Sequence, residues 1–240
     1  MRNKLLALLF VVVVSTLLIQ FVWKSLDEDF VCYVADPKKE TISFHYKNNQ
    51  QTNFQNVNNL KQWFSSSSTE LVFAMNGGMY KKDKSPQGLY IEKGQTIVKL
   101  DTASGEGNFY LKPNGVFHIT NKKEAKIAAT DVFIANTDIK FATQSGPMLL
   151  INGEIHAAFN KSSTNVNIRN GVGILPNGQV IFAMSKKEIN FYNFASFFKE
   201  KGCKNALYLD GFVSRTYCPN QNWIQTDGDF GVIIAVTKNK

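Results

Sequence analysis

The sequence has 240 residues, of which 44% are hydrophobic and 19% charged, and its formal net charge is +8. This length and apolar content suit one domain with a single buried core, and no repeat or low-complexity tract interrupts it. The lysines are scattered, without dense basic runs or interleaved aromatic residues, which argues against a nucleic-acid-binding protein. A basic surface of this kind still favours anionic partners.

An apolar segment lies near the N-terminus. Residues 5–23 contain no charged side chain and follow Arg2 and Lys4. As a helix this segment spans about 30 Å, which is enough to cross the hydrocarbon core of a membrane. It is longer than the usual core of a signal peptide and lacks small residues at a cleavage site, so a signal anchor is favoured over a cleaved signal peptide. We therefore expect residues 1–24 to be that segment and residues 25–240 to form a domain in the cell envelope, on the periplasmic or extracellular side of the membrane, or a secreted domain if the segment is cleaved.

Three cysteines are consistent with export, since one disulfide leaves one free thiol. Cys203 and Cys218 are the expected pair because they flank a predicted strand–turn–strand. No metal site is expected, because the sequence has no Cys-x-x-Cys and its histidines are far apart, at His45, His118 and His156. No cofactor is expected either, because the glycine-rich motifs of dinucleotide and nucleoside-triphosphate binding are missing.

Alternating and apolar runs predict a β-rich first half. Strands are expected at residues 31–34, 42–46 and 71–75, and a short helix at residues 58–66. Two hairpins follow, one of residues 88–92 and 96–100 and one of residues 109–111 and 116–119. Asn-Gly pairs at 152–153 and 177–178 repeat the turn chemistry. The predicted fold class is therefore α+β, a β-rich mixed sheet built largely from antiparallel hairpins with a few flanking helices, as a single domain after the N-terminal segment.

A polar turn follows the apolar strand of residues 71–75. Asn76, Gly77 and Gly78 stand directly after that strand. Two adjacent glycines allow backbone N–H groups to face outward as an anion-binding nest, and the Asn76 amide adds donors and an acceptor. The alternative is a tight hairpin turn without a ligand.

Two later segments carry polar residues into strands. Gln144, Ser145 and Gly146 precede a constrained Gly-Pro step and an apolar strand, and Arg169 enters a strand that contains two glycines. Lysine outnumbers arginine 24 to 3, which indicates that arginine is kept where its planar fork binds carboxylate or phosphate. Arg169, and to a lesser extent Arg215, are candidate phosphate ligands on this ground. The alternative for each is a structural ion pair.

The last motif follows a helix of residues 190–201 that ends at Gly202. The strand of residues 206–209 then brings Asp210 to Gly211, where the backbone can turn sharply, and Ser214 follows. A lone carboxylate at the end of a strand is well placed to meet a ligand. The alternative is an ordinary Asp-Gly turn, in which the carboxylate bonds only to its own backbone.

Four motifs in order resemble those of the phosphodiester glycosidase family: N-G-G-M-Y at 76–80, Q-S-G-P-M-L at 144–149, R-N-G-V-G at 169–173 and L-D-G-x-x-S at 209–214. The resemblance extends over residues 70–235 and implies hydrolysis of a sugar–phosphate diester at the anomeric carbon. The sequence departs from the family pattern at Phe212 and Val213, where glycines are usual, and at Asn170, where a small hydroxyl residue is usual. The substrate of better-known members therefore does not carry over.

This chemistry needs no strong general acid, because a phosphate leaving group is already a weak base. Asp210 is expected to act as nucleophile or general base, and Arg169 as a bidentate phosphate clamp. Donors to the phosphate or to sugar hydroxyls are expected from Asn76, Gly77, Gly78, Gln144 and Ser145, with Gly146 beside them and Ser214 as support.

The sequence leaves three functions open. The favoured one is an exported envelope hydrolase that cleaves a glycosyl phosphodiester in a cell-surface or exopolysaccharide glycan. The second is a non-catalytic protein of glycan-phosphate binding or polysaccharide assembly, and the third is a phosphoesterase that cleaves the P–O bond. A second carboxylate, if the reaction requires one, stays open among Asp138, Glu154 and Asp227.

Overall fold

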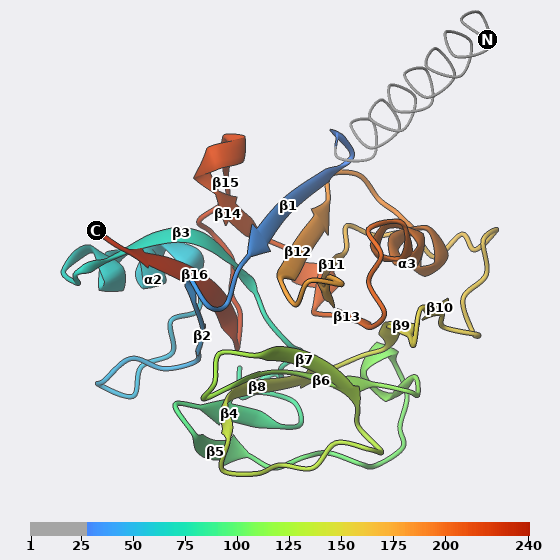
Figure 1. Ribbon diagram of the computed structural model, residues 1–240, viewed down its shortest axis with the longest axis horizontal. Helices are drawn as coiled ribbons and strands as arrows, with labels where there is room; N and C mark the ends of the chain where they lie inside the picture. Colours follow the sequence, from blue (N-terminus) through green and yellow to red (C-terminus); the bar gives the residue numbers. More distant parts are fainter. Residues whose placement is uncertain (1–27) are drawn as a thin grey trace, which may run out of the picture.

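The computed structural model describes residues 28–240, which form three antiparallel sheets and two α-helices (Figure 1). Residues 5–23, the expected signal anchor, lie outside the described residues. The first sheet has six strands in the order β1 (Phe30–Ala35), β12 (Val180–Ser185), β11 (Asn170–Ile174), β13 (Ala206–Tyr208), β9 (Met148–Ile151) and β10 (Glu154–Ile155).

The other two sheets have five strands each. The second runs in the order β15 (Trp223–Ile224), β14 (Thr216–Cys218), β3 (Thr69–Asn76), β16 (Ile233–Asn239) and β2 (Thr41–His45). The third runs in the order β5 (Gln95–Val98), β4 (Tyr90–Glu92), β8 (Ile139–Ser145), β6 (Gly115–Thr120) and β7 (Ala125–Ala129). The helices are α2 (Val57–Ser65) and α3 (Phe191–Glu200), and short 3-10 turns are η1 (Asn108–Tyr110), η2 (Gly211–Val213) and η3 (Pro219–Gln221).

The inner faces of the three sheets share one apolar core. Four phenylalanines meet there, with ring centroids 5.4 Å apart for Phe44 and Phe117, 5.3 Å for Phe73 and Phe182, and 5.9 Å for Phe117 and Phe182. They come from β2, β6, β3 and β12, so every sheet contributes a ring. Burial of these large side chains is the main force that holds the three sheets together.

The two helices cover outer faces of the sheets. Phe194 and Phe198 of α3 pack with Ile181 of β12 in one apolar cluster, while Phe182 points to the central core. This division follows from the alternation of side chains along a strand. Each helix begins at an asparagine N-cap, and α3 ends at Gly202, whose φ of +81° suits the residue after a helix.

The predicted fold class is confirmed: the domain is β-rich, has few helices, and is built from antiparallel pairs. Every strand pair of the described part is antiparallel, and the strands divide into three sheets instead of one mixed sheet. Both Asn-Gly turns are present, between β9 and β10 and between β11 and β12. Within residues 28–240, none of the helices is long and apolar enough to cross a membrane.

One predicted hairpin is wrong. Residues 109–111, expected as a strand, lie in and beside the 3-10 turn η1. The reason is competition for the edges of β6, which pairs with β7 on one side and β8 on the other. Asn114 instead holds the turn, because its Nδ2 donates to the carbonyl oxygen of Phe109 at 2.9 Å.

The predicted disulfide is also wrong, because Cys203 and Cys218 are both free thiols. Cys203 packs beside α3 and Cys218 packs in the central core, so the two side chains belong to different apolar clusters.

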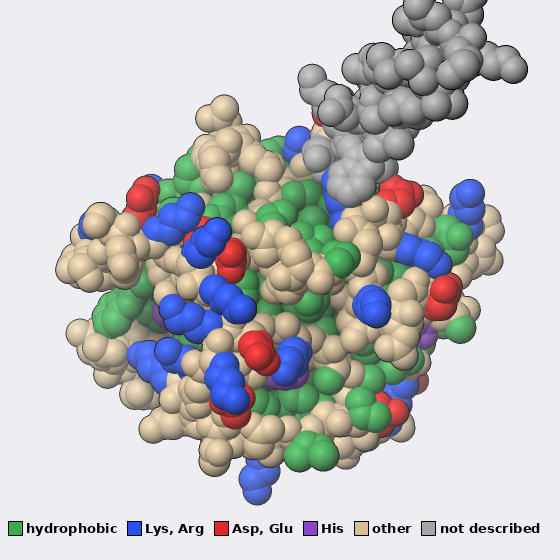
Figure 2. Space-filling model, in the orientation of Figure 1, with side chains coloured by type: hydrophobic (Ala, Val, Ile, Leu, Met, Phe, Trp, Pro, Cys, Tyr) green, Lys and Arg blue, Asp and Glu red, His purple; other side chains and the backbone are tan. Residues whose placement is uncertain are grey.

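On the face seen in Figure 2, lysine and arginine side chains are spread out, with acidic side chains between them. The predicted lack of a nucleic-acid partner stays a prediction.

Candidate active site

Asn76, the last residue of β3, connects three of the four motifs. Its side chain is 1% exposed. Its Nδ2 donates to the carbonyl oxygen of Asp210 (2.6 Å), and its Oδ1 accepts from the backbone N–H of Arg215 (3.0 Å) and from Nδ2 of Asn170 (3.0 Å). Because these contacts use most of the hydrogen-bonding capacity of the amide, Asn76 is a positioning residue and not the substrate donor that the sequence predicted.

The glycines after Asn76 allow close packing, and the N–H of Gly77 is not available to the predicted anion nest. The N–H of Gly77 donates to the carbonyl oxygen of Val232 (2.8 Å), and the Gly77 carbonyl accepts from the N–H of Asp210 (3.2 Å). A Cβ on Gly78 would lie 2.6 Å from the carbonyl oxygen of Gln144. The glycine pair therefore lets the end of β3 approach both β8 and the segment that carries Asp210.

The side chain of Gln144 is fully buried and is not available to a substrate. Its Oε1 accepts from the N–H groups of Leu89 (2.9 Å) and Asp101 (3.0 Å). Its Nε2 donates to the carbonyl oxygen of Asp101 (2.7 Å) and to Oγ1 of Thr130 (3.2 Å). The predicted role of Gln144 as a phosphate donor is therefore wrong, because the amide holds the loop around Asp101 to the third sheet.

Ser145 and Gly146 bring the third sheet against β13. The Oγ of Ser145 is buried and has no hydrogen-bond partner among the described residues. A Cβ on Gly146 would lie 2.6 Å from Cβ of Asn114. The carbonyl oxygen of Pro147, the next residue, accepts from the N–H of Tyr208 (3.1 Å). All four motifs therefore meet where one end of each sheet converges.

Asp210 lies at this meeting point and is partly exposed. Its negative charge acts on two tyrosine hydroxyls, those of Tyr80 and Tyr208. Burial, and then the negative charge of Asp210, raise the pKa of Tyr80 to about 12. Burial also raises the pKa of Tyr208, although the charge of Arg169 opposes the increase. Both tyrosines are therefore neutral hydroxyl groups at neutral pH.

Arg169 is buried just before β11, with 1% of its surface exposed, and its guanidinium lies 3.7 Å from the ring centroid of Phe191. Nε donates to the carbonyl oxygen of Ile189 (2.7 Å), and Nη2 donates to the carbonyl oxygen (2.9 Å) and Oδ1 (3.1 Å) of Asn165. Nη1 lies 3.4 Å from the hydroxyl of Tyr208. Since both edges of the fork are occupied, this arrangement contradicts the predicted bidentate grip on phosphate.

The partners of Arg169 are all uncharged. None of the described carboxylates forms an ion pair with it, so the structural ion pair considered from the sequence is not present either. Burial lowers the pKa of the guanidinium, but an arginine stays charged at neutral pH. Arg169 thus adds positive charge to the site, and its link to the site is the Tyr208 hydroxyl.

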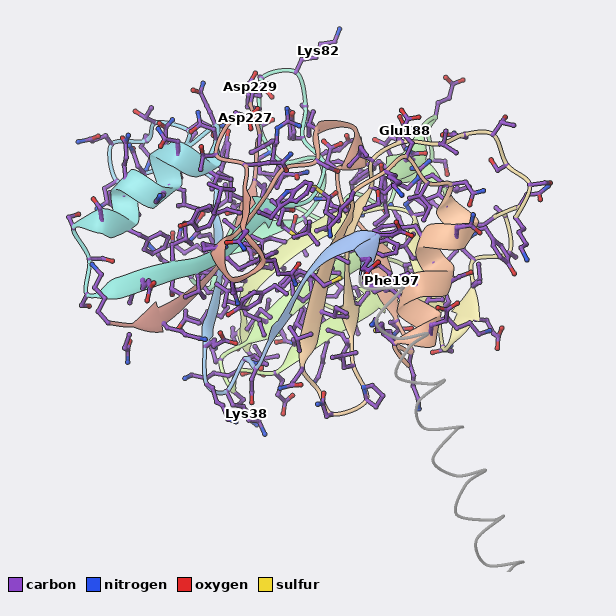
Figure 3. All side chains as sticks on the ribbon, turned by 90° about the horizontal axis from the view of Figure 1, so that it is seen from above. Lys38, Lys82, Glu188, Phe197, Asp227 and Asp229 are labelled. Atoms are coloured by element: carbon purple, nitrogen blue, oxygen red, sulfur yellow. The ribbon has the colours of Figure 1, made fainter. Side chains whose placement is uncertain are left out.

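Ser214 supports the turn that follows Asp210. Its buried Oγ donates to the carbonyl oxygen of Gly211 (2.7 Å). Gly211 and Ser214 also line a cavity of about 390 Å³, whose far wall comes from the residues around the end of β12. Seen from above, Asp227 and Asp229 lie close together, and Glu188 lies well apart from them on the side of α3 (Figure 3).

The three candidates for a second carboxylate differ in their surroundings. Asp227 binds Arg215, the residue after Ser214, through two contacts of 2.9 Å. Glu154 instead pairs with Lys199 of α3 at 2.9 Å. Asp138 lies at the start of β8, at the opposite end of that strand from Ser145. Of the three candidates, Asp227 is therefore the one that contacts the loop carrying Asp210, through Arg215.

Sequence reasoning missed Tyr80, Tyr208 and the hydrogen bonds of Asn170 with Asn76. Tyrosines next to two motifs were a usable signal, whereas the contacts of Asn170 with Asn76 required the fold. Within the described part of the chain, no group of three or more histidine, cysteine, aspartate or glutamate side chains is arranged to hold a metal ion.

A model of the phosphodiester glycosidase family matches residues 69–235. The chain belongs to this family. It is 39% identical over 188 residues to the uncharacterized protein YigE of Escherichia coli strain K12, an alignment that covers 77% of this chain and 72% of that protein. The resemblance seen in the four motifs is thereby confirmed. The phosphodiester glycosidase domain supports glycosidase-type hydrolysis of a phosphodiester.

Solved structures share the fold of this domain. The catalytic domain of zebrafish N-acetylglucosamine-1-phosphodiester alpha-N-acetylglucosaminidase, auto-inhibited by its pro-peptide, matches with a TM-score of 0.59 at 14% identity, over 87% of this chain and 82% of that chain. A hypothetical protein from Synechocystis matches with a TM-score of 0.52 at 13% identity, over 87% of this chain and 59% of that chain. At such identities the likeness concerns the fold alone.

Proposed function

We propose that this protein is an exported envelope enzyme that hydrolyses a glycosyl phosphodiester at the anomeric carbon, with Asp210 as the catalytic carboxylate. The supporting observation is that both backbone groups of Asp210 bind the first motif. The N–H donates to the carbonyl oxygen of Gly77 (3.2 Å), and the carbonyl accepts from Nδ2 of Asn76 (2.6 Å). A catalytic group must be held close to its productive geometry, and these bonds hold Asp210 where the four motifs meet.

In the proposed reaction the bond between the anomeric carbon and the phosphate oxygen breaks, and its electron pair leaves with the phosphate. Asp210 either attacks the anomeric carbon, forming a glycosyl ester that water then hydrolyses, or accepts a proton from the water that attacks this carbon directly. The products are a free sugar and a phosphate monoester. The positive charge of Arg169, which no described carboxylate pairs, reduces the repulsion between Asp210 and an anionic substrate.

Asp210→Asn tests this proposal, because asparagine keeps the shape and cannot act as nucleophile or base. We expect turnover of a sugar phosphodiester to fall by at least about a hundredfold, the usual effect of losing a positioned acid–base group. Asp131→Asn is the matched control, since Asp131 is exposed in a loop of the third sheet. Turnover within threefold of the parent in a folded Asp210→Asn protein would refute the catalytic assignment.

Hydrolysis in oxygen-18 water separates the alternative functions. Label in the released sugar indicates cleavage at the anomeric carbon, as proposed. Label in the phosphate indicates a phosphoesterase, and binding without product from several glycosyl phosphodiesters indicates a glycan-phosphate binding or assembly protein.

The proposed location in the envelope rests on the sequence of residues 5–23 behind Arg2 and Lys4. We propose that the domain lies on the outer side of the membrane, held by an uncleaved anchor, and acts on a cell-surface or exopolysaccharide glycan. The full-length chain should fractionate with membranes, and its domain should be digested by protease only from outside the cytoplasm. Soluble recovery of the uncleaved chain would refute the anchor.

A further inference from the structure

The cavity of about 390 Å³ beside Asp210 has a lining suited to a phosphorylated sugar. The residues that matter most are Ser214, Arg215, Trp223 and Gln225 on one wall and Lys186 and Glu188 on the other. Its volume lies in the range of small-molecule sites. It combines two cations with one carboxylate, an indole ring and an amide, the groups that recognise an anion joined to hydroxyl-bearing rings.

The position of Arg215 is fixed by the same side chain that holds Asp210. The N–H of Arg215 donates to Oδ1 of Asn76 (3.0 Å), and its carbonyl accepts from the N–H of Asn76 (3.4 Å). Nδ2 of Asn76 binds the carbonyl of Asp210 (2.6 Å). Residues 210–215 therefore form a loop with both ends held at Asn76, and the carboxylate and the guanidinium extend from opposite ends of it.

The guanidinium of Arg215 is accessible, unlike that of Arg169. Its side chain is 38% exposed, whereas Arg169 as a whole is 1% exposed. Nε contacts Asp227 and Nη1 donates to the carbonyl oxygen of Ser214 (3.0 Å). Nη2 has no hydrogen-bond acceptor within residues 28–240, so one prong of the fork remains for a ligand.

The surrounding side chains also keep unused capacity. Lys186 Nζ donates to the backbone carbonyl of Glu28 (2.9 Å), an uncharged partner, and forms no ion pair within the described chain. Oε1 of Gln225 accepts from Nε1 of Trp223 (3.0 Å) and from the N–H of Thr216 (3.1 Å). These bonds fix the indole ring and leave the amide NH₂ of Gln225 as a donor, without an acceptor in the described residues.

We propose that this cavity is the subsite for the phosphate and the group that it esterifies, with Arg215 and Lys186 as the phosphate ligands. Trp223, Gln225 and Glu188 contact a sugar or polyol beyond the phosphate, Glu188 by accepting from its hydroxyls. The substrate class is then a glycan whose units are joined through phosphodiesters, and the leaving phosphate stays bound after cleavage. This inference rests on the proposed function, because it assigns a subsite to the half of the substrate that leaves when the bond to the sugar is cleaved at Asp210.

Binding of glucose 6-phosphate, a phosphate monoester like the leaving half of the substrate, and of inorganic phosphate to the full-length protein tests the subsite, measured by isothermal titration calorimetry. Arg215→Gln keeps both backbone bonds to Asn76, and we expect it to weaken binding of glucose 6-phosphate by about tenfold or more, the effect of losing a charged hydrogen bond. Lys186→Gln should weaken it several-fold. Lys187→Gln is the matched control, because the Lys187 side chain is 83% exposed and pairs with Asp29 outside the cavity.

A second arm separates the phosphate from the sugar. Trp223→Ala should weaken binding of glucose 6-phosphate more than binding of inorganic phosphate, because the indole contacts only the ring. The proposal is refuted if the parent binds neither probe, if a folded Arg215→Gln protein binds glucose 6-phosphate as the parent does, or if Lys187→Gln weakens binding equally. These measurements need no turnover, so an active Asp210→Asn protein refutes the proposed function and leaves the subsite result standing.

Discussion

Replacing Asn76 by alanine should be unusually damaging for a single polar residue, because its side chain connects β3 to three separate segments. The change removes the bonds to the carbonyl of Asp210 and to the N–H of Arg215, both partly buried, and it removes one of the two acceptors of Asn170. An unsatisfied buried group costs about 1–3 kcal/mol, so the expected loss in the free energy of unfolding is about 3–5 kcal/mol.

Urea unfolding followed by circular dichroism measures this loss, and the dependence on urea should keep its slope. Asn177→Ala is the matched control, since Asn177 is exposed and bonds only to its neighbour Gln179; it should lie within about 0.5 kcal/mol of the parent. Asn76→Asp should be at least as unstable as Asn76→Ala, because it puts an acceptor against the Asp210 carbonyl. A loss below about 1 kcal/mol in Asn76→Ala would show that the hub does not hold the site together.

Three further outcomes are expected from urea unfolding. Arg169→Lys should lower the free energy of unfolding by about 2–4 kcal/mol, because a lysine cannot replace the hydrogen bonds at both edges of the buried guanidinium. A loss under about 0.5 kcal/mol would contradict this. Gly78→Ala should lower the free energy of unfolding by more than about 2 kcal/mol, because the new Cβ would collide with β8. Gly94→Ala has open space around it but a φ of +81°, so it should lower this free energy by only about 1 kcal/mol. Equal losses in the two variants would refute the packing argument. Burial, and then the charge of Lys93, lower the pKa of His45 from 6.5 to about 4. The free energy of unfolding should therefore be highest above pH 6.5, where His45 is neutral in both states, and should fall by up to about 3 kcal/mol as the pH drops to 4. His45→Gln should remove this fall, and an unchanged dependence of stability on pH in that variant would refute the assignment.

The sequence alone identified the secondary structure wherever the signal is local. The Asn-Gly turns, the phenylalanine spacing of α3 and the apolar run of β3 each depend on neighbours within a few residues, and all are present. Local rules also identified the four motifs, and their order was enough to recognise the family. The same rules gave a wrong prediction for residues 109–111, because both edges of β6 pair with other strands, which the local sequence does not reveal.

Only the tertiary structure decided which polar side chains remain for a ligand. Residue type gives the number of donors and acceptors, but it does not say which of them the fold consumes. Asn76 binds Asp210 across 134 positions of sequence, and Gln144 binds Asp101 across 43. The guanidinium of Arg169, the phosphate ligand that the sequence favoured, is occupied by its hydrogen bonds and by Phe191, while that of Arg215 stays accessible. A hydrogen bond between distant residues depends on where the sheets meet, and that is determined by burial of the whole apolar core.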